Sequence, residues 1–131
     1  MKKKETLDFC NRWLPTWGGD RPNELIDFYS DDALYFDPAN KAGLRGREEI
    51  LPYFKKLLSA NPKWKWEPVE VYSTDLGFVA KWRATIPVGT ETVVEDGMDI
   101  VEVKHGKITR NEVYFDRSAL LDALRKLKSG K

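Results

Sequence analysis

The second half of the chain alternates between apolar and polar residues, and this pattern constrains the fold more than any other feature. A period of two is typical of strands that bury one face. Short segments rich in Gly, Pro, Asp and Thr interrupt it. The pattern therefore predicts four strands, over residues 64–71, 78–86, 92–104 and 107–116. His105-Gly106-Lys107 marks the tip where the last two strands meet, which predicts a hairpin.

The register of this hairpin decides what surrounds one acidic residue, Asp99. A three-residue loop with Gly106 in the left-handed conformation is the favoured reading, because it groups more apolar residues on one face. That face would carry Asp99, Val101, Val103, Thr109, Asn111, Val113 and Phe115. A two-residue loop would instead place Asp99 opposite Glu112, because a slip of one residue exchanges the two faces.

In either register, Asp99 lies among valine and isoleucine. A carboxylate on a buried strand face is costly unless it has a partner or a task. Asp99 is therefore the main functional candidate.

The first half of the chain reads mostly as helix. Apolar residues recur at helical spacing over residues 4–18, 22–29 and 47–60, and again from Leu120 to Leu127. A short strand is expected over 33–37, followed by a glycine-containing loop over 39–46 with room for a strand near Leu44. Helices first and strands afterwards are typical of an α+β domain with helices on one face of a curved sheet. The 131 residues fit a single domain spanning 1–131.

Composition excludes several classes of function. The net charge of +1 argues against binding to nucleic acid or an anionic membrane. No apolar run is long enough for a membrane span or a signal-peptide core, so a cytoplasmic location is expected. Cys10 is the only cysteine, which excludes an internal disulfide. No metal-ligand spacing and no phosphate-binding loop is present.

Several motifs, taken in order, resemble one known family. They are Phe28-Tyr29-Ser30-Asp31-Asp32-Ala33, Phe36-Asp37-Pro38, Gly43-x-x-Gly46-Arg47-Glu48-Glu49-Ile50, the hairpin with Asp99, and Asp116-Arg117-x-x-Leu120-Leu121. Over about residues 5–124, the chain resembles the SnoaL-like branch of the nuclear transport factor 2-like superfamily.

The resemblance implies a cystatin-like conical α+β barrel, in which a curved, mixed but largely antiparallel sheet wraps around the N-terminal helices. It also implies an internal apolar pocket for a small molecule, and a homodimer formed through the outer sheet face. The family includes polyketide cyclases, ketosteroid isomerases, limonene epoxide hydrolases, dehydratases and proteins without known catalysis. No cofactor is implied.

The resemblance also assigns candidate catalytic residues. In ketosteroid isomerases, the general base is an Asp followed by Pro, which falls on Asp37, and the second pocket acid falls on Asp99. Such an isomerase is a known case of a carboxylic acid kept neutral by an apolar site. Their donor tyrosine on the first helix would fall near Arg12 or Trp13, and neither is a tyrosine.

Other family members suggest a third acid. The acid of the cyclases falls on Asp116, and the limonene epoxide hydrolases are similar at Tyr114-Phe115-Asp116. Those hydrolases need an Arg two residues before the middle Asp, where this chain has Gly97. That difference counts against epoxide hydrolysis.

Each candidate has an alternative structural role. Asp37 is either a proton-abstracting base or a turn residue that accepts backbone N–H groups beside Pro38. Asp99 is either a general acid or a polar residue paired with Asn111 or a Trp indole. Asn111 is either a ligand for a substrate carbonyl or the partner of Asp99, and the second is favoured. For Asp116, a helix cap is favoured over a pocket acid.

Aromatic and apolar residues supply candidates for the pocket wall. Trp64 and Trp66 fit an exposed sheet edge or a dimer surface better. Tyr35 and Tyr114 are candidates to replace the missing donor tyrosine, if their hydroxyl groups point inward. The expected ligand-binding residues are Trp13, Trp17, Phe36, Phe54, Trp82, Val101, Asn111, Val113 and Phe115.

Two functions remain open from sequence alone. The first is a cofactor-independent isomerase, cyclase or lyase acting on a small apolar carbonyl compound, with Asp37 as base and Asp99 as acid or oxyanion donor. The alternative is a non-catalytic module of the same fold that binds a small ligand or dimerises. The two are distinguished by whether Asp37 and Asp99 converge on one cavity.

Overall fold

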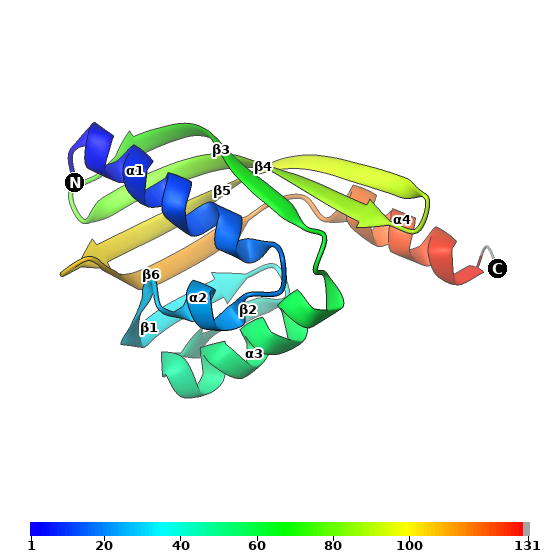
Figure 1. The fold of residues 1–131 in the computed structure, drawn as a ribbon, viewed down its shortest axis with the longest axis horizontal. Coiled ribbons are helices and arrows are strands. Elements are labelled where there is room, and N and C mark those ends of the chain that lie inside the picture. Colours follow the sequence, from blue (N-terminus) through cyan, green and yellow to red (C-terminus); the bar gives the residue numbers. More distant parts are fainter. Residues whose placement is uncertain (130–131) are drawn as a thin grey trace.

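A computed structural model describes residues 1–129 and shows an α+β arrangement built on one six-stranded sheet. The strand order is β2-β1-β6-β5-β4-β3. Within residues 1–129, only the β1–β6 pair is parallel, so the sheet is mixed, and it curves without closing into a barrel (Figure 1). The strands are β1 (Tyr29–Asp37), β2 (Asn40–Arg45), β3 (Lys65–Ser73), β4 (Gly77–Val88), β5 (Glu91–Lys104) and β6 (Lys107–Tyr114).

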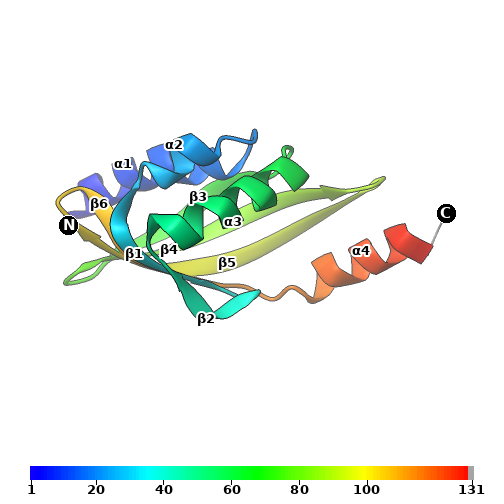
Figure 2. The same cartoon turned by 90° about the horizontal axis from the view of Figure 1, so that it is seen from below.

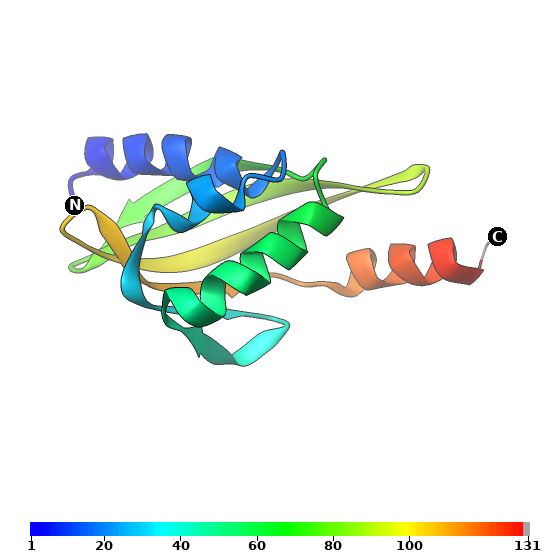
Figure 3. The same cartoon turned by 60° about the horizontal axis from the view of Figure 1, so that its bottom comes forward.

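Three helices and a 3₁₀ turn cover one face of this sheet, and a fourth helix contacts β4 and β5 near the tip of their hairpin. In Figures 2 and 3, α1, α2 and α3 lie together on one side, whereas α4 extends beyond the sheet below the tip of the β4–β5 hairpin. No helix within residues 1–129 is long and apolar enough to cross a membrane. The helical segments are α1 (Lys3–Trp13), η1 (Leu14–Trp17), α2 (Pro22–Ile26), α3 (Gly46–Ala60) and α4 (Ser118–Ser129).

The first expected helix is divided at Pro15. α1 ends at Trp13, and the chain continues as the 3₁₀ segment η1, because proline cannot donate the next helical hydrogen bond. Gly18 follows and lies against the backbone of Trp64, where a Cβ atom would be only 2.1 Å from the carbonyl oxygen. This contact fixes η1, and with it Trp17, against the start of β3.

Two further differences concern the first strands. β1 starts at Tyr29, so the second helix is shorter than its apolar pattern predicted. Residues 40–45 form the strand β2, which pairs with β1, although a loop was the main expectation there. Strand pairing supplies backbone hydrogen bonds that the sequence pattern alone does not reveal.

The central hairpin combines features of both expected registers. His105 and Gly106 both have positive φ, 54° and 77°, and Lys104 pairs with Lys107, so the loop has two residues rather than three. A register shift follows at once, because Glu102 pairs with Arg110 and leaves Thr109 as an extra residue. The bulge restores the favoured grouping, with Asp99 opposite Val113 and Val101 opposite Asn111.

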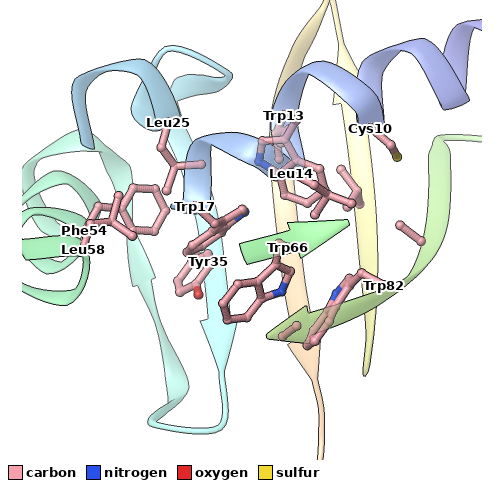
Figure 4. Packing of buried hydrophobic residues seen from close by; sticks show 14 of the residues in the cluster. Cys10, Trp13, Leu14, Trp17, Leu25, Tyr35, Phe54, Leu58, Trp66 and Trp82 are labelled. Atoms are coloured by element: carbon pink, nitrogen blue, oxygen red, sulfur yellow. The ribbon is translucent and has the colours of Figure 1, made fainter. Parts of the chain in front are cut away.

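The core lies between the sheet and the three covering helices. Alternate residues of β4 point inward, from Phe78 through Trp82 to Ile86, and all of them are buried. Phe9 and Trp13 of α1 pack on Phe78, with ring centroids 5.7 and 6.2 Å away. Figure 4 shows this aromatic packing continuing through Trp17 and Trp66. The helices therefore fill one end of the concave face and leave the other end for the site.

Candidate functional site

A cavity of about 400 Å³ lies between the concave face of the sheet, α3 and α4. Trp17, Trp64 and Trp66 form an aromatic wall. The ring centroids of Trp17 and Trp66 are 6.3 Å apart, and Figure 4 shows these two rings. Four leucines at helical spacing close the side made by α4. They are Leu120, Leu121, Leu124 and Leu127.

Asp37, at the end of β1, lines this cavity and is 9% exposed. Its Oδ2 accepts hydrogen bonds from the hydroxyls of Tyr35 at 2.9 Å and Tyr53 at 2.6 Å. Its Oδ1 accepts from the backbone N–H of Ala39 at 3.0 Å and from the backbone N–H and side-chain Nδ2 of Asn40, both at 2.9 Å. These five donors occupy the roughly four lone-pair sites of a carboxylate. Asp37 is thus both a turn residue and a cavity residue.

The two tyrosines around Asp37 remain neutral. Burial and the hydrogen bond to Asp37 raise the pKa of Tyr53 well above its usual value. Burial also raises the pKa of Tyr35, with the charge of Asp37 adding to it. A protonated hydroxyl is the form that donates to a carboxylate, so the pKa shifts and the geometry agree.

Asp99 reaches the same cavity from β5 and is only 2% exposed. Trp82 Nε1 donates to its Oδ1 at 2.9 Å, and Asn111 Nδ2 donates to its Oδ2 at 3.2 Å. The amide of Asn111 is held in turn by the hydroxyl of Tyr29, which donates to its Oδ1 at 2.7 Å. Each oxygen of Asp99 thus receives one hydrogen bond, which leaves each with a further lone pair.

Burial raises the pKa of Asp99 to about 7. The hydrogen bonds from Trp82 and Asn111 favour the ionised form but only partly offset burial, and the negative charge of Asp37 raises the pKa further. Asp99 therefore changes its protonation state near neutral pH, which is the property of an efficient general acid or base.

Gly97 makes room for the indole that holds Asp99. A Cβ at this position would lie 2.4 Å from the ring of Trp82 and 2.7 Å from the Cβ of Phe115. Gly97 pairs with Trp82 across the β4–β5 ladder, so the ring lies directly over the glycine. The absence of an arginine here thus has a structural reason, because Trp82 fills the space.

The cavity brings together five of the residues predicted from the sequence: Asp37, Asp99, Trp17, Val113 and Phe115. Trp82 and Asn111 do not line it but hold Asp99 from behind. Asp116 is exposed and caps α4 by accepting a hydrogen bond from the Ser118 N–H at 2.9 Å. Hydrogen bonding to the Ser118 side chain and then to its backbone N–H lowers the pKa of Asp116.

Four residues predicted to bind the ligand lie elsewhere. Trp13, Phe54 and Val101 are fully buried in the core, because the helices pack onto the sheet at that level. Phe36 points toward β2, where its ring would be 2.4 Å from a Cβ at Gly43. Tyr114 is 53% exposed, so of the two tyrosines considered as donors only Tyr35 reaches the cavity.

Sequence reasoning missed several cavity residues. Trp66 is 8% exposed and lines the cavity with Trp64, although both were expected at an edge or dimer surface. Tyr53 was read only as part of a helix, and nothing in its local sequence marks its contact with Asp37. Arg117 is part of the motif Asp116-Arg117-x-x-Leu120-Leu121. Its charge, next to a row of leucines, was a signal in the sequence that could have marked it as a cavity residue.

Among residues 1–129, no three His, Cys, Asp or Glu side chains are grouped so that they could hold a metal ion. The polar groups that line the cavity include two carboxyl groups, two tyrosine hydroxyls and the guanidinium of Arg117, beside an apolar wall.

Comparison with known proteins places this geometry in a family. The model of the SnoaL-like domain matches residues 10–111. No curated protein matches the chain by sequence.

Solved structures share the fold at low identity. A protein of Catenulispora acidiphila with a ketosteroid isomerase-like fold, in complex with trimethylamine, is 20% identical with a TM-score of 0.78, covering 92% of this chain and 94% of that one. AclR of Streptomyces galilaeus, a candidate hydroxylase, is 15% identical with a TM-score of 0.77, and the match covers 95% of this chain and 98% of that one. A candidate SnoaL-like polyketide cyclase of Jannaschia sp. CCS1 is 13% identical with a TM-score of 0.75, and the match covers 92% of each chain. The chain belongs to the SnoaL-like domain family.

Proposed function

We propose that this protein is a cofactor-independent acid–base enzyme that moves a proton at a carbon next to the carbonyl group of a small, largely apolar compound. One observation carries the proposal: Asp37 and Asp99, from strands that are not neighbours, line the same apolar cavity. The fold is shared with a candidate SnoaL-like polyketide cyclase, whose class of chemistry fits this arrangement. Isomerisation, cyclisation and elimination all include such a proton transfer.

Asp99 is the group that exchanges the proton in this proposal. It keeps an unused lone pair on each oxygen, whereas the five donors around Asp37 occupy its acceptor sites. Ionised Asp99 takes a proton from the carbon, the C–H electron pair moves toward the carbonyl oxygen, and protonated Asp99 then returns a proton. This assignment replaces the sequence-based expectation that Asp37 is the base.

Asp37 has an electrostatic and positioning role. Its charge is one of the causes that raise the pKa of Asp99 toward neutrality. It also fixes the hydroxyls of Tyr35 and Tyr53 at one end of the cavity. Asp37 therefore keeps a fixed set of hydrogen bonds, whereas Asp99 gains and loses the proton. The different surroundings of the two carboxyl groups give them different roles.

Hydrogen–deuterium exchange tests the proposal without knowledge of the natural substrate. The wild-type protein is incubated in D₂O with 2-tetralone, 4-phenylbutan-2-one and 3-benzoylpropionate, and the α-carbon protons are followed by ¹H NMR. We expect at least one ketone to exchange faster than in protein-free buffer, with the excess proportional to protein concentration. Exchange at the buffer rate for every ketone, with protein that remains folded, would count against proton transfer.

A further inference from the structure

Arg117 lies in the connection between β6 and α4 and is the only cation among the described residues that line the cavity. Its side chain is half-buried. Its guanidinium is close enough to Tyr53 to lower the pKa of that hydroxyl slightly, against the larger effects that raise it. The positive charge therefore lies at the polar end of the cavity, next to the Tyr35–Asp37–Tyr53 cluster.

This guanidinium has much unused capacity for hydrogen bonds. Within residues 1–129, its one hydrogen bond runs from Nη2 to the carbonyl oxygen of Pro38 at 3.4 Å, close to the limit for such a contact. It forms no ion pair with a carboxylate in that part of the chain, whereas Arg110 binds Glu102 and Arg83 binds Asp96. Asp37 is already satisfied by five other donors. An arginine has five N–H donors in a planar fork that matches a carboxylate.

We propose that Arg117 is a specificity residue that binds the carboxylate of the substrate, so that the compound turned over is an apolar oxo acid rather than a neutral ketone. This inference adds a substrate class to the proposed function. It rests on that function for the presence of a reacting carbonyl group. The carboxylate pairs with Arg117, and the apolar body lies against Trp66, Ile86 and the leucines of α4. The carbonyl then lies between the two ends, in reach of Asp99.

Within this cavity an acid can bind only at Arg117, because the other charged groups that line it are carboxyl groups. Asp37 and ionised Asp99 together would oppose an anion in an otherwise apolar space, so an anionic substrate needs a local cation. Arg117, which contacts the Pro38 carbonyl and is not one of the hydrogen-bond donors to Asp99, supplies that cation. The bidentate geometry also orients the substrate, which a neutral apolar contact does not.

Binding of matched acid and ester pairs tests this inference by calorimetry, without any turnover. The probes are 3-benzoylpropionate and 3-(2-naphthoyl)propionate, each beside its methyl ester. We expect the wild-type protein to bind at least one acid about tenfold or more tightly than its ester, the size typical of a charge-assisted hydrogen bond. Arg117→Gln should remove that preference by weakening the acid, with the ester changed less than about twofold. Arg117→Lys should retain part of it.

Arg125→Gln is the matched control, because Arg125 lies on α4 but is exposed and pairs with Asp122. It should leave both affinities unchanged. The inference is overturned if the wild-type protein binds neither acid more tightly than its ester, absence of binding included. It is also overturned if Arg117→Gln weakens acid and ester equally, which would indicate a purely structural role. A retained acid preference without any proton exchange would refute the proposed function alone.

Discussion

Replacing Asp99 by asparagine is expected to slow the proton-exchange reaction about a hundred- to ten-thousandfold, the range typical of a positioned acid or base. Asparagine has nearly the same shape but cannot take up or release the proton. Its Nδ2 would face Asn111, whose amide can turn so that Oδ1 accepts from this group. Asn111 Nδ2 would then face the Tyr29 hydroxyl, which can accept a hydrogen bond in place of donating one. The cavity therefore keeps its shape while the reactive group is lost. ¹H NMR exchange in D₂O at equal concentrations of folded protein measures the effect.

Asp96→Asn is the control for this variant. Asp96 lies three residues before Asp99 on β5, but it is on the outer sheet face, where it pairs with Arg83. The exchange rate of Asp96→Asn should equal that of the wild type.

The exchange rate of the wild type should rise with pH through about 7, as Asp99 ionises, and then level off. Equal rates for Asp99→Asn and wild type would remove Asp99 from the reaction.

The free energy of unfolding is expected to fall as pH rises toward 7, because of Asp99. The pKa of Asp99 is about 7 in the folded protein and 3.8 when unperturbed. Between these values the unfolded chain has lost a proton that the folded protein still holds, so the free energy of unfolding falls as pH rises. The stabilisation is complete below pH 3.8 and is lost once pH exceeds 7. The full difference corresponds to about 4 kcal/mol, at 1.36 kcal/mol per pKa unit.

Urea unfolding of wild type and Asp99→Asn at a series of pH values from 4 to 8 isolates this contribution, because all other acids are common to both proteins. We expect the wild type to lose about 4 kcal/mol relative to the variant across that range, most of it before pH 7. The constant offset from the altered hydrogen bonds does not depend on pH. A difference between the two proteins that stays flat, or that rises in favour of the wild type, would show that Asp99 is ionised in the folded state.

Much of the fold follows from hydrophobic patterning, and the site follows only in part. The alternation after Trp64 predicted the four later strands, and an acid within the apolar pattern of β5 marked Asp99 as buried. The loop length was wrong, and Ile108 rather than Thr109 pairs with Val103. The predicted grouping of Asp99 and Val101 with Asn111 and Val113 was right, because burial of the apolar residues selects the register and a bulge at Thr109 accommodates the shorter turn. Patterning thus constrains faces more strongly than it constrains turns.

Contacts between distant segments are what the sequence did not reveal. Asp37 and Tyr53 are 16 residues apart and meet only because α3 crosses β1. Trp64 and Trp66 looked suited to an edge strand, and β3 is indeed an edge strand. Its inner face is nevertheless covered, since η1 packs there and places Trp17 against Trp66. A period-two pattern indicates which face of the sheet a residue lies on, but it does not indicate which other segment covers that face.

Asp99 lines the cavity, and the proposed function requires that it exchange a proton near neutral pH. The most direct test is an NMR titration of the protein labelled with ¹³C at the aspartate carboxyl carbons, with the Asp99 signal assigned by its absence from Asp99→Asn. We expect that signal to shift with a midpoint near pH 7. A midpoint at or below about 4, the value of an ordinary aspartate, would contradict the account, because Asp99 would then be a permanently ionised partner of Trp82 and Asn111.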